Sequence, residues 1–247
     1  MIGKGGAGAS ILLALESSTP KGGVALFRDG EAVDGIRLSE GLRHGRDLMP
    51  AASAILKRNG IAVESVSSIA VSSGPGSYTG VRVGVMSAKA LAYGLGCRLT
   101  AVSSLAALAA TLLLLKEAEA GDLAFIAQNA RRSEVYVGLY GLEKDGVAAL
   151  APDAALTPEE ARGRLDSLLR GDERLLAAGS GFSAYPGVFS GLEGVVKPLE
   201  TVDPSAVAWL GWRNLREGKT ADPLLLQPLY LRRDGDKGWS RDCLIDA

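Results

Sequence analysis

The sequence predicts a mixed α/β protein with two lobes, and three observations support this fold class. The chain opens with three short apolar segments, at residues 11–16, 24–27 and 31–38, whose polar separators are typical of consecutive antiparallel strands. Apolar strand-like segments then alternate with longer segments rich in Ala and Leu, as in α/β folds. A second succession of strand-like and helix-like segments begins after Gly121 and Asp122.

The 247 residues divide into three predicted parts. We expect residues 1–10 to form a flexible N-terminal extension, because they are rich in Gly and Ala and lack the apolar core of a signal peptide. Residues 11–120 form the predicted first lobe and residues 121–247 the second. The two cysteines, Cys97 and Cys243, have neither metal-type nor disulfide-type spacing, which indicates a reducing, cytoplasmic setting.

The composition is that of a globular protein, with 47% hydrophobic residues, 22% charged residues and a mean hydropathy of +0.16. The formal net charge of -1 lacks the basic excess of a protein that holds nucleic acid by itself. If RNA is involved, a partner is expected to supply most of the affinity. The longest apolar run, residues 105–115, is too short to span a bilayer.

In the first lobe, Asp29-Gly30 is a hairpin signal between the second and third strands. A helix is predicted at residues 44–59, with Asp47 as its cap and Pro50 tolerated in its first turn. A strand, a helix, a strand and a helix follow, at residues 67–72, 80–95, 99–102 and 104–118. Three antiparallel strands followed by helices are how a ribonuclease-H-like domain of the actin-like ATPase superfamily begins, which is an analogy of fold alone.

In the second lobe, strands are predicted at residues 123–128 and 134–142, followed by a turn. Thr157 to Glu160 is a capping box with Pro at the first helical position, so a helix should run to residue 169. A short strand at residues 175–178 leads into a glycine turn. Asp203 should cap a helix that reaches residue 217.

Residues 73–84, with the sequence SGPGSYTGVRVG, predict a strand, a tight glycine turn and a helix. Such a turn leaves N–H groups at a helix N-terminus, where an anion is favoured, although many glycine turns serve sterics alone. The spacing fits neither a Walker loop nor a dinucleotide fingerprint. Small residues recur every fourth position along the helix, which predicts a closely packed neighbour, either the lobe's own sheet or a partner's helix. These residues are Gly80, Gly84, Ala88, Ala92 and Gly96.

The same stretch resembles the signature of the TsaB (YeaZ) family, a family of tRNA threonylcarbamoyladenosine biosynthesis proteins. The resemblance extends from Leu13 to about Arg233 and includes a C-terminal Tyr-Leu-Arg segment that begins at Tyr230. It implies two ribonuclease-H-like lobes. The matching positions of the turn include Gly74, Pro75, Gly76, Ser77, Tyr78, Thr79, Gly80 and Arg82.

Three loops are expected where an actin-like ATPase binds nucleotide: the turn after Glu16, the turn after Asn129, and the turn from Gly179 to Gly181. ATP-using members carry aspartates in the first two loops, which hold Mg²⁺ directly or through water. Here Glu and Asn stand in their place, and Ser17 replaces a glycine that lets the backbone approach phosphate. We therefore expect degenerate nucleotide loops, with no cofactor, no metal and no catalytic residue.

The resemblance implies a non-catalytic scaffold that pairs with TsaD as a heterodimer. With the ATPase TsaE, that assembly transfers threonylcarbamoyl from threonylcarbamoyl-adenylate to N6 of adenosine 37 in tRNAs that read codons starting with A. Contact with tRNA would be indirect, through the complex, and no membrane is involved. The partner-binding helices carry over to residues 47–59 and 80–95. The side chains expected at the interface are His44, Leu48, Ala52, Ile55, Val81 and Val85.

An exposed apolar face on these helices would also let the isolated chain form a homodimer. His44 is the single histidine, which excludes a two-histidine metal site. A structural role near the start of a helix is the commoner interpretation of such a histidine, and a role at the interface is the other one. Two alternatives remain at this point. One is an enzyme of the same superfamily, either a small-molecule kinase or a glycopeptidase-like hydrolase. The other is a module that binds nucleotide without chemistry.

Overall fold

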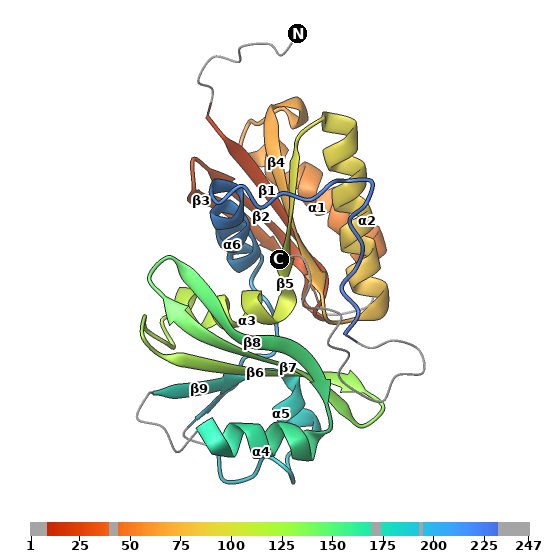
Figure 1. Ribbon diagram of the computed structural model, residues 1–247. Coiled ribbons are helices and arrows are strands. Elements are labelled where there is room, and N and C mark those ends of the chain that lie inside the picture. The colour runs from red at the N-terminus through yellow and green to blue at the C-terminus, as the bar shows by residue number, and fades with distance from the viewer. Residues whose placement is uncertain (1–8, 40–43, 169–173, 193–194, 232–247) are drawn as a thin grey trace.

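The computed structural model describes residues 9–39, 44–168, 174–192 and 195–231, and within these ranges the chain forms two lobes, each with a five-stranded sheet (Figure 1). Most of the predicted N-terminal extension and the side chain of His44 lie outside the described part.

The first sheet has the strand order β3-β2-β1-β4-β5. Strand β2 is antiparallel to both β1 and β3, whereas β4 runs parallel to β1 and β5. Asp29 and Gly30 connect β2 to β3 with φ values of 53° and 89°, so the predicted hairpin turn is confirmed. The strands are β1 (Ile11–Glu16), β2 (Gly23–Arg28), β3 (Glu31–Arg37), β4 (Val66–Gly74) and β5 (Arg98–Ser103).

The second sheet repeats this plan in the order β10-β9-β6-β7-β8. Strand β7 is antiparallel to β6 and β8, and β9 is parallel to β6 and β10. The repeat confirms the predicted ribonuclease-H-like plan of both lobes. The strands are β6 (Leu123–Arg131), β7 (Glu134–Glu143), β8 (Gly146–Leu156), β9 (Leu175–Ala178) and β10 (Val196–Lys197).

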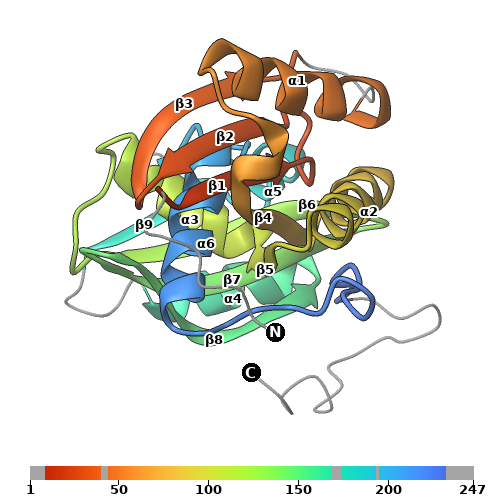
Figure 2. The same cartoon turned by 90° about the horizontal axis from the view of Figure 1, so that it is seen from above.

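The helices cover both faces of each sheet (Figures 1 and 2). Helices α1 and α2 pack on one face of the first sheet and α6 on the other, while α3 lies between α6 and the second sheet. Helices α4 and α5 cover the far face of the second sheet. The helices are α1 (His44–Arg58), η1 (Val63–Ser65), α2 (Tyr78–Leu95), α3 (Ser104–Leu114), α4 (Pro158–Leu168), α5 (Ser180–Ala184) and α6 (Pro204–Arg216).

Strand β1 shows how the layers share one sheet. Leu13 and Leu15 enter the core under α1 and α2, whereas Leu12 and Ala14 enter the core around α3 and α6. This alternation follows from the two-residue period of a strand, and it requires apolar residues on both faces. The whole strand is therefore buried.

Helix α6 comes after the predicted boundary at residue 120 but lies on the first sheet. A Cβ atom at Gly211 would stand 2.4 Å from Cβ of Ala70, so the absence of a side chain lets helix and strand approach closely. The Asn214 amide donates to the carbonyl of Ala101 at 3.1 Å. The C-terminal part of the chain thus contributes a layer to the first lobe.

The predicted helix caps are confirmed in two of three cases. Thr157 and Glu160 form the reciprocal capping box of α4, and the Asp203 carboxylate accepts from the Ser205 N–H at 2.8 Å. Asp47 is corrected: α1 already begins at His44, so Asp47 lies inside the first turn.

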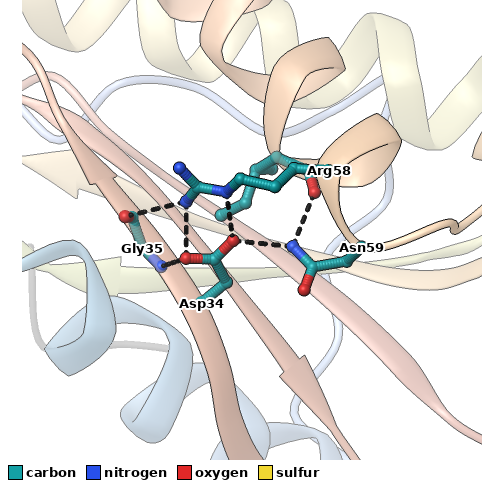
Figure 3. A network of polar contacts seen from close by, with 5 residues as sticks. Asp34, Gly35, Arg58 and Asn59 are labelled. Carbon is teal, nitrogen blue, oxygen red and sulfur yellow. Dashed lines mark hydrogen bonds and ion pairs between the residues drawn. The ribbon is translucent and has the colours of Figure 1, made fainter.

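A polar network joins β3 to the end of α1 (Figure 3). The Arg58 guanidinium donates to both carboxylate oxygens of Asp34, at 2.7 and 2.5 Å, and the Asn59 amide donates to the same carboxylate at 2.6 Å. The Asn59 amide also donates to the Ile55 carbonyl at 2.8 Å. Hydrogen bonds from Arg58 and Asn59 lower the pKa of Asp34 below its ordinary value.

Candidate functional site

The signature turn packs directly onto the turn that follows β1. Built Cβ atoms at Gly76 and Gly80 would stand 2.5 Å from the Ser18 carbonyl oxygen and 2.0 Å from the Ser17 carbonyl oxygen. At Gly84 a Cβ would stand 2.3 Å from the Ser17 hydroxyl oxygen. Gly76 and Gly80 are therefore required for this contact, because a side chain at either position would meet the backbone of the other turn, whereas one at Gly84 would displace the Ser17 hydroxyl.

Hydrogen bonds fix the same contact. The Ser77 N–H donates to the Ser18 carbonyl at 2.9 Å, and the Ser17 hydroxyl donates to the Gly80 carbonyl at 2.8 Å. The Ser77 hydroxyl caps α2 by accepting from the Gly80 N–H. The glycines thus have a steric role, and the Ser77 and Gly80 N–H groups at this helix start have acceptors within the chain.

The Glu16 carboxylate lies fully buried at the end of β1. Its Oε1 accepts from the N–H groups of Ser18 and Thr19 at 2.8 and 3.0 Å. The hydroxyls of the same two residues donate to it at 2.7 and 3.2 Å. Oε2 has no hydrogen-bond partner among the residues that the structure describes. Burial raises the pKa of this carboxyl, and the donors around it, Ser18 foremost, offset part of the rise.

A chain of hydroxyls extends from this carboxylate. Ser72, near the end of β4, donates to the Ser18 hydroxyl at 3.1 Å and lies 2.6 Å from the Ser104 hydroxyl at the start of α3. All three serines are buried. Residues 17–19 of the turn after β1 are therefore held by contacts within the chain, whereas Pro20 and Lys21 are exposed.

The two loops predicted in the second lobe lie together, and the predicted turn after Asn129 is present at residues 132–133, between β6 and β7. Asn129 itself lies within β6, where its N–H donates to the Ser180 hydroxyl at 3.1 Å and its Oδ1 accepts from the Arg131 N–H at 2.8 Å. A Cβ at Gly179, where φ is 123°, would stand 2.1 Å from the Ala127 carbonyl oxygen. This glycine turn is closely packed on β6.

Gly181, which follows that turn, is also close to β6, with a built Cβ 2.8 Å from the Ala127 carbonyl oxygen. The first turn reaches toward the second lobe through Thr19, whose hydroxyl accepts from the Val202 N–H at 3.3 Å. The loops of the expected nucleotide site are thus engaged in intramolecular contacts.

The side chains predicted to contact a partner are buried in the first lobe. They have exposed fractions of 2% or less and belong to the core under α1 and α2, because the apolar face of each helix packs on its own sheet. The choice of these side chains is therefore corrected. They are Leu48, Ala52, Ile55, Val81 and Val85.

The stripe of small residues on α2 also serves the chain's own sheet, with Gly84 facing Val71 of β4. Gly96, the last residue of the stripe, is instead the left-handed cap of α2 at φ 60°. The apolar side chains that α1 and α2 expose are different ones. They are Met49, Tyr78, Met86 and Tyr93, with exposed fractions of 38%, 59%, 59% and 69%.

A strap formed by residues 221–231 crosses from β5 over α2 to the signature turn. The Ala221 N–H donates to the Leu99 carbonyl, and the Leu229 N–H donates to the Ser73 carbonyl, each at 2.8 Å. Lys89 of α2 donates to the Leu226 carbonyl at 2.7 Å. Sequence reasoning identified the Tyr-Leu-Arg segment in this strap but could not place it.

The strap brings an aromatic ring to the signature turn. The rings of Tyr78 and Tyr230 lie 5.5 Å apart, and the Arg82 guanidinium lies 4.5 Å from the centre of the Tyr78 ring. Tyr78 is 59% exposed and Tyr230 is 42% exposed. Aromatic and Arg side chains are enriched in protein interfaces, so this end of α2 extends the surface available to a partner.

Comparisons with known proteins agree with this geometry. Residues 41–197 match the family model described as "TsaD: tRNA N6-adenosine threonylcarbamoyltransferase". The tRNA threonylcarbamoyladenosine biosynthesis protein TsaB of Bacillus subtilis is 32% identical over 90% of this chain and 93% of its own length. The chain belongs to the TsaB family. The TsaB protein of Escherichia coli is 31% identical over 90% of this chain and 95% of its own length.

A solved TsaB-like fold supports the same assignment. The structure of YeaZ from Pseudomonas aeruginosa matches this chain with a TM-score of 0.77 and 26% identity. The match covers 90% of this chain and 100% of the YeaZ chain. Within the described ranges, no three His, Cys, Asp or Glu side chains gather as a metal site would require. No helix in the same ranges is both long and apolar enough to cross a membrane.

Proposed function

We propose that this chain is a non-catalytic subunit of the cytoplasmic assembly that modifies tRNA with threonylcarbamoyl. Membership of the TsaB family links the chain to threonylcarbamoyladenosine biosynthesis. In the proposed assembly it pairs with TsaD and acts with TsaE, which together transfer threonylcarbamoyl from threonylcarbamoyl-adenylate to N6 of adenosine 37. The chain contacts tRNA through the complex.

The closed turn after β1 is the observation that carries the non-catalytic role. An ATPase of this fold needs that turn open, with backbone N–H groups free for phosphate. Here the Glu16 carboxylate takes the N–H groups of Ser18 and Thr19, and the backbone of the signature turn covers the other side. Asn129 likewise brings no charge for Mg²⁺. These features argue against the alternative of a kinase or hydrolase.

The exposed side chains of α1 and α2 support a partner interface on this face. Met86 and Tyr93 are large, apolar and more than half exposed, and Tyr78 with Arg82 continues the face toward the signature turn. Groups of large apolar side chains on a protein surface often mark a site where another protein binds. We place the TsaD interface here, and the isolated chain would form a homodimer through the same face.

Substitution of this face tests the proposal. Replacing Met86 and Tyr93 together by Arg should weaken binding to TsaD by at least about tenfold, because central apolar side chains each contribute over about 1 kcal/mol. Leu150→Arg is the matched control, since Leu150 is 54% exposed on β8 of the other lobe. Calorimetric titration gives the affinities. Unchanged binding by the folded double variant would place the interface elsewhere.

A turnover assay separates the proposal from the enzyme alternative. The purified chain with ATP and Mg²⁺ should release no phosphate above the level of a heat-denatured sample. Turnover that survives further purification and depends on residues of this chain would reject the non-catalytic role.

A further inference from the structure

The turn after β1 has the donor set of an oxyanion site. Two backbone N–H groups and two hydroxyls, all from Ser18 and Thr19, converge on a single oxygen, Oε1 of Glu16, at 2.7 to 3.2 Å. Converging backbone N–H groups are how proteins bind anions, and hydrogen bonds to an ionised acceptor are stronger than those between neutral groups.

The two oxygens of the Glu16 carboxylate differ in their hydrogen bonding. Oε2 is buried without a hydrogen-bond partner among the described residues, although burying an unsatisfied polar atom is costly. The four hydrogen bonds that the carboxylate accepts at 2.7 to 3.2 Å come from the donors of the turn, and Ser72 of β4 adds a further favourable interaction. Glu16 acts toward the donors of the turn as a bound anion would.

We propose that residues 17–19 form an oxyanion-binding turn whose ligand is the chain's own Glu16 carboxylate, and that the turn binds a free small carboxylate when this side chain is shortened. The signature turn packs against the carbonyl groups of this turn and holds it in place, because built Cβ atoms at Gly76 and Gly80 fall within 2.5 Å of the Ser18 and Ser17 carbonyl oxygens. The inference is independent of the proposed function.

Glu16→Ala provides a closely matched test, because the atoms that it removes correspond to acetate. The variant leaves the four donors without their acceptor, and its melting temperature should fall by several degrees. Sodium acetate should then restore stability, and at ten times its dissociation constant the unfolding equilibrium should shift by about 11-fold. Sodium chloride at equal ionic strength should restore nothing.

Two control variants make the result specific. Val71→Ala opens an apolar space in the strand paired with β1, beside Leu15, and offers no donors, so acetate should not stabilise it. Glu16→Gln keeps an acceptor oxygen in the site and should also be insensitive to acetate. The wild-type chain, whose site is filled, should behave in the same way.

Refolding keeps the proposal falsifiable if Glu16→Ala does not fold in chloride. The fraction of chain recovered after dilution from urea should then rise with acetate in this variant alone. Absence of acetate rescue in both melting and refolding would overturn the proposal. Equal rescue of Val71→Ala or of the wild-type chain would also overturn it, because it would show a general salt effect.

Discussion

Replacing Gly80 by Ala should destabilise the chain strongly, although Ala is the better helix former. The new Cβ would stand 2.0 Å from the Ser17 carbonyl oxygen, whereas ordinary contacts begin at 3.4 Å. Overpacking of this kind costs about 3 kcal/mol, and the displaced turn would weaken hydrogen bonds worth about 1 kcal/mol. The gain in helix propensity, about 1 kcal/mol, offsets part of this. We expect a net loss of about 3 kcal/mol.

Gly94→Ala in the same helix is the matched control. No atom lies within 4 Å of a Cβ built at Gly94, so only the propensity gain applies. Thermal unfolding followed by circular dichroism should show a fall of about 6–12 °C for Gly80→Ala and a rise of about 2–4 °C for Gly94→Ala. Equal stability of the two variants would refute the close approach of the two turns.

Two further predictions concern carboxylates. Arg58→Met should cost at most about 1 kcal/mol at neutral pH, because the Arg58 side chain is 53% exposed and solvent screens its pair with Asp34. The pKa of Asp34 is lowered in the folded chain, so the stability that the Arg58–Asp34 pair contributes is present above the ordinary pKa of 3.8 and is lost as pH falls below it. Urea unfolding of the wild-type chain and of Arg58→Met at several pH values measures this contribution. Tyr140→Phe removes a hydroxyl that donates to the partly buried Asp153 and should cost about 1–3 kcal/mol. Burial raises the pKa of Asp153 and this hydrogen bond lowers it, so the variant's pKa should rise further in an NMR titration. A loss of stability in Arg58→Met that does not depend on pH would contradict the first assignment. An unchanged pKa of Asp153 in Tyr140→Phe would contradict the second.

The sequence predicts the strands and helices of the first lobe well, since period-two and helical patterns there are strong. It misses β8, because Pro152 and the surrounding alanines weaken the strand pattern. The structure explains why Pro152 is tolerated: β8 is an edge strand, where a missing N–H breaks no essential ladder. The turn at residues 144–146 could have identified β8, because a tight turn after a strand predicts a second, antiparallel strand.

The burial of Val81 and Val85 shows where sequence reasoning about the interface fails. The spacing of apolar residues identifies the apolar face of α2, but a helix that lies on a sheet packs this face against its own core. Met86 and Tyr93 stand outside the periodic face, and large apolar residues at such positions are the better signal of a partner.

The close contact between the signature turn and the turn after β1 could not be predicted either. Gly76 and Gly80 are about sixty residues away from Ser18 and Ser17 in sequence, and only the parallel pairing of β1 with β4 brings them together. The glycine pattern shows that a close neighbour exists. It does not identify the neighbour.

Formation of threonylcarbamoyladenosine on unmodified tRNA tests the central claim most directly. TsaD, TsaE and threonylcarbamoyl-adenylate would be combined with and without this chain, and the chain would also be assayed alone. The proposed role predicts modification that depends on the chain, rises with its concentration until TsaD is saturated, and is absent with the chain alone. Equal modification without the chain, or modification by the chain alone, would contradict it.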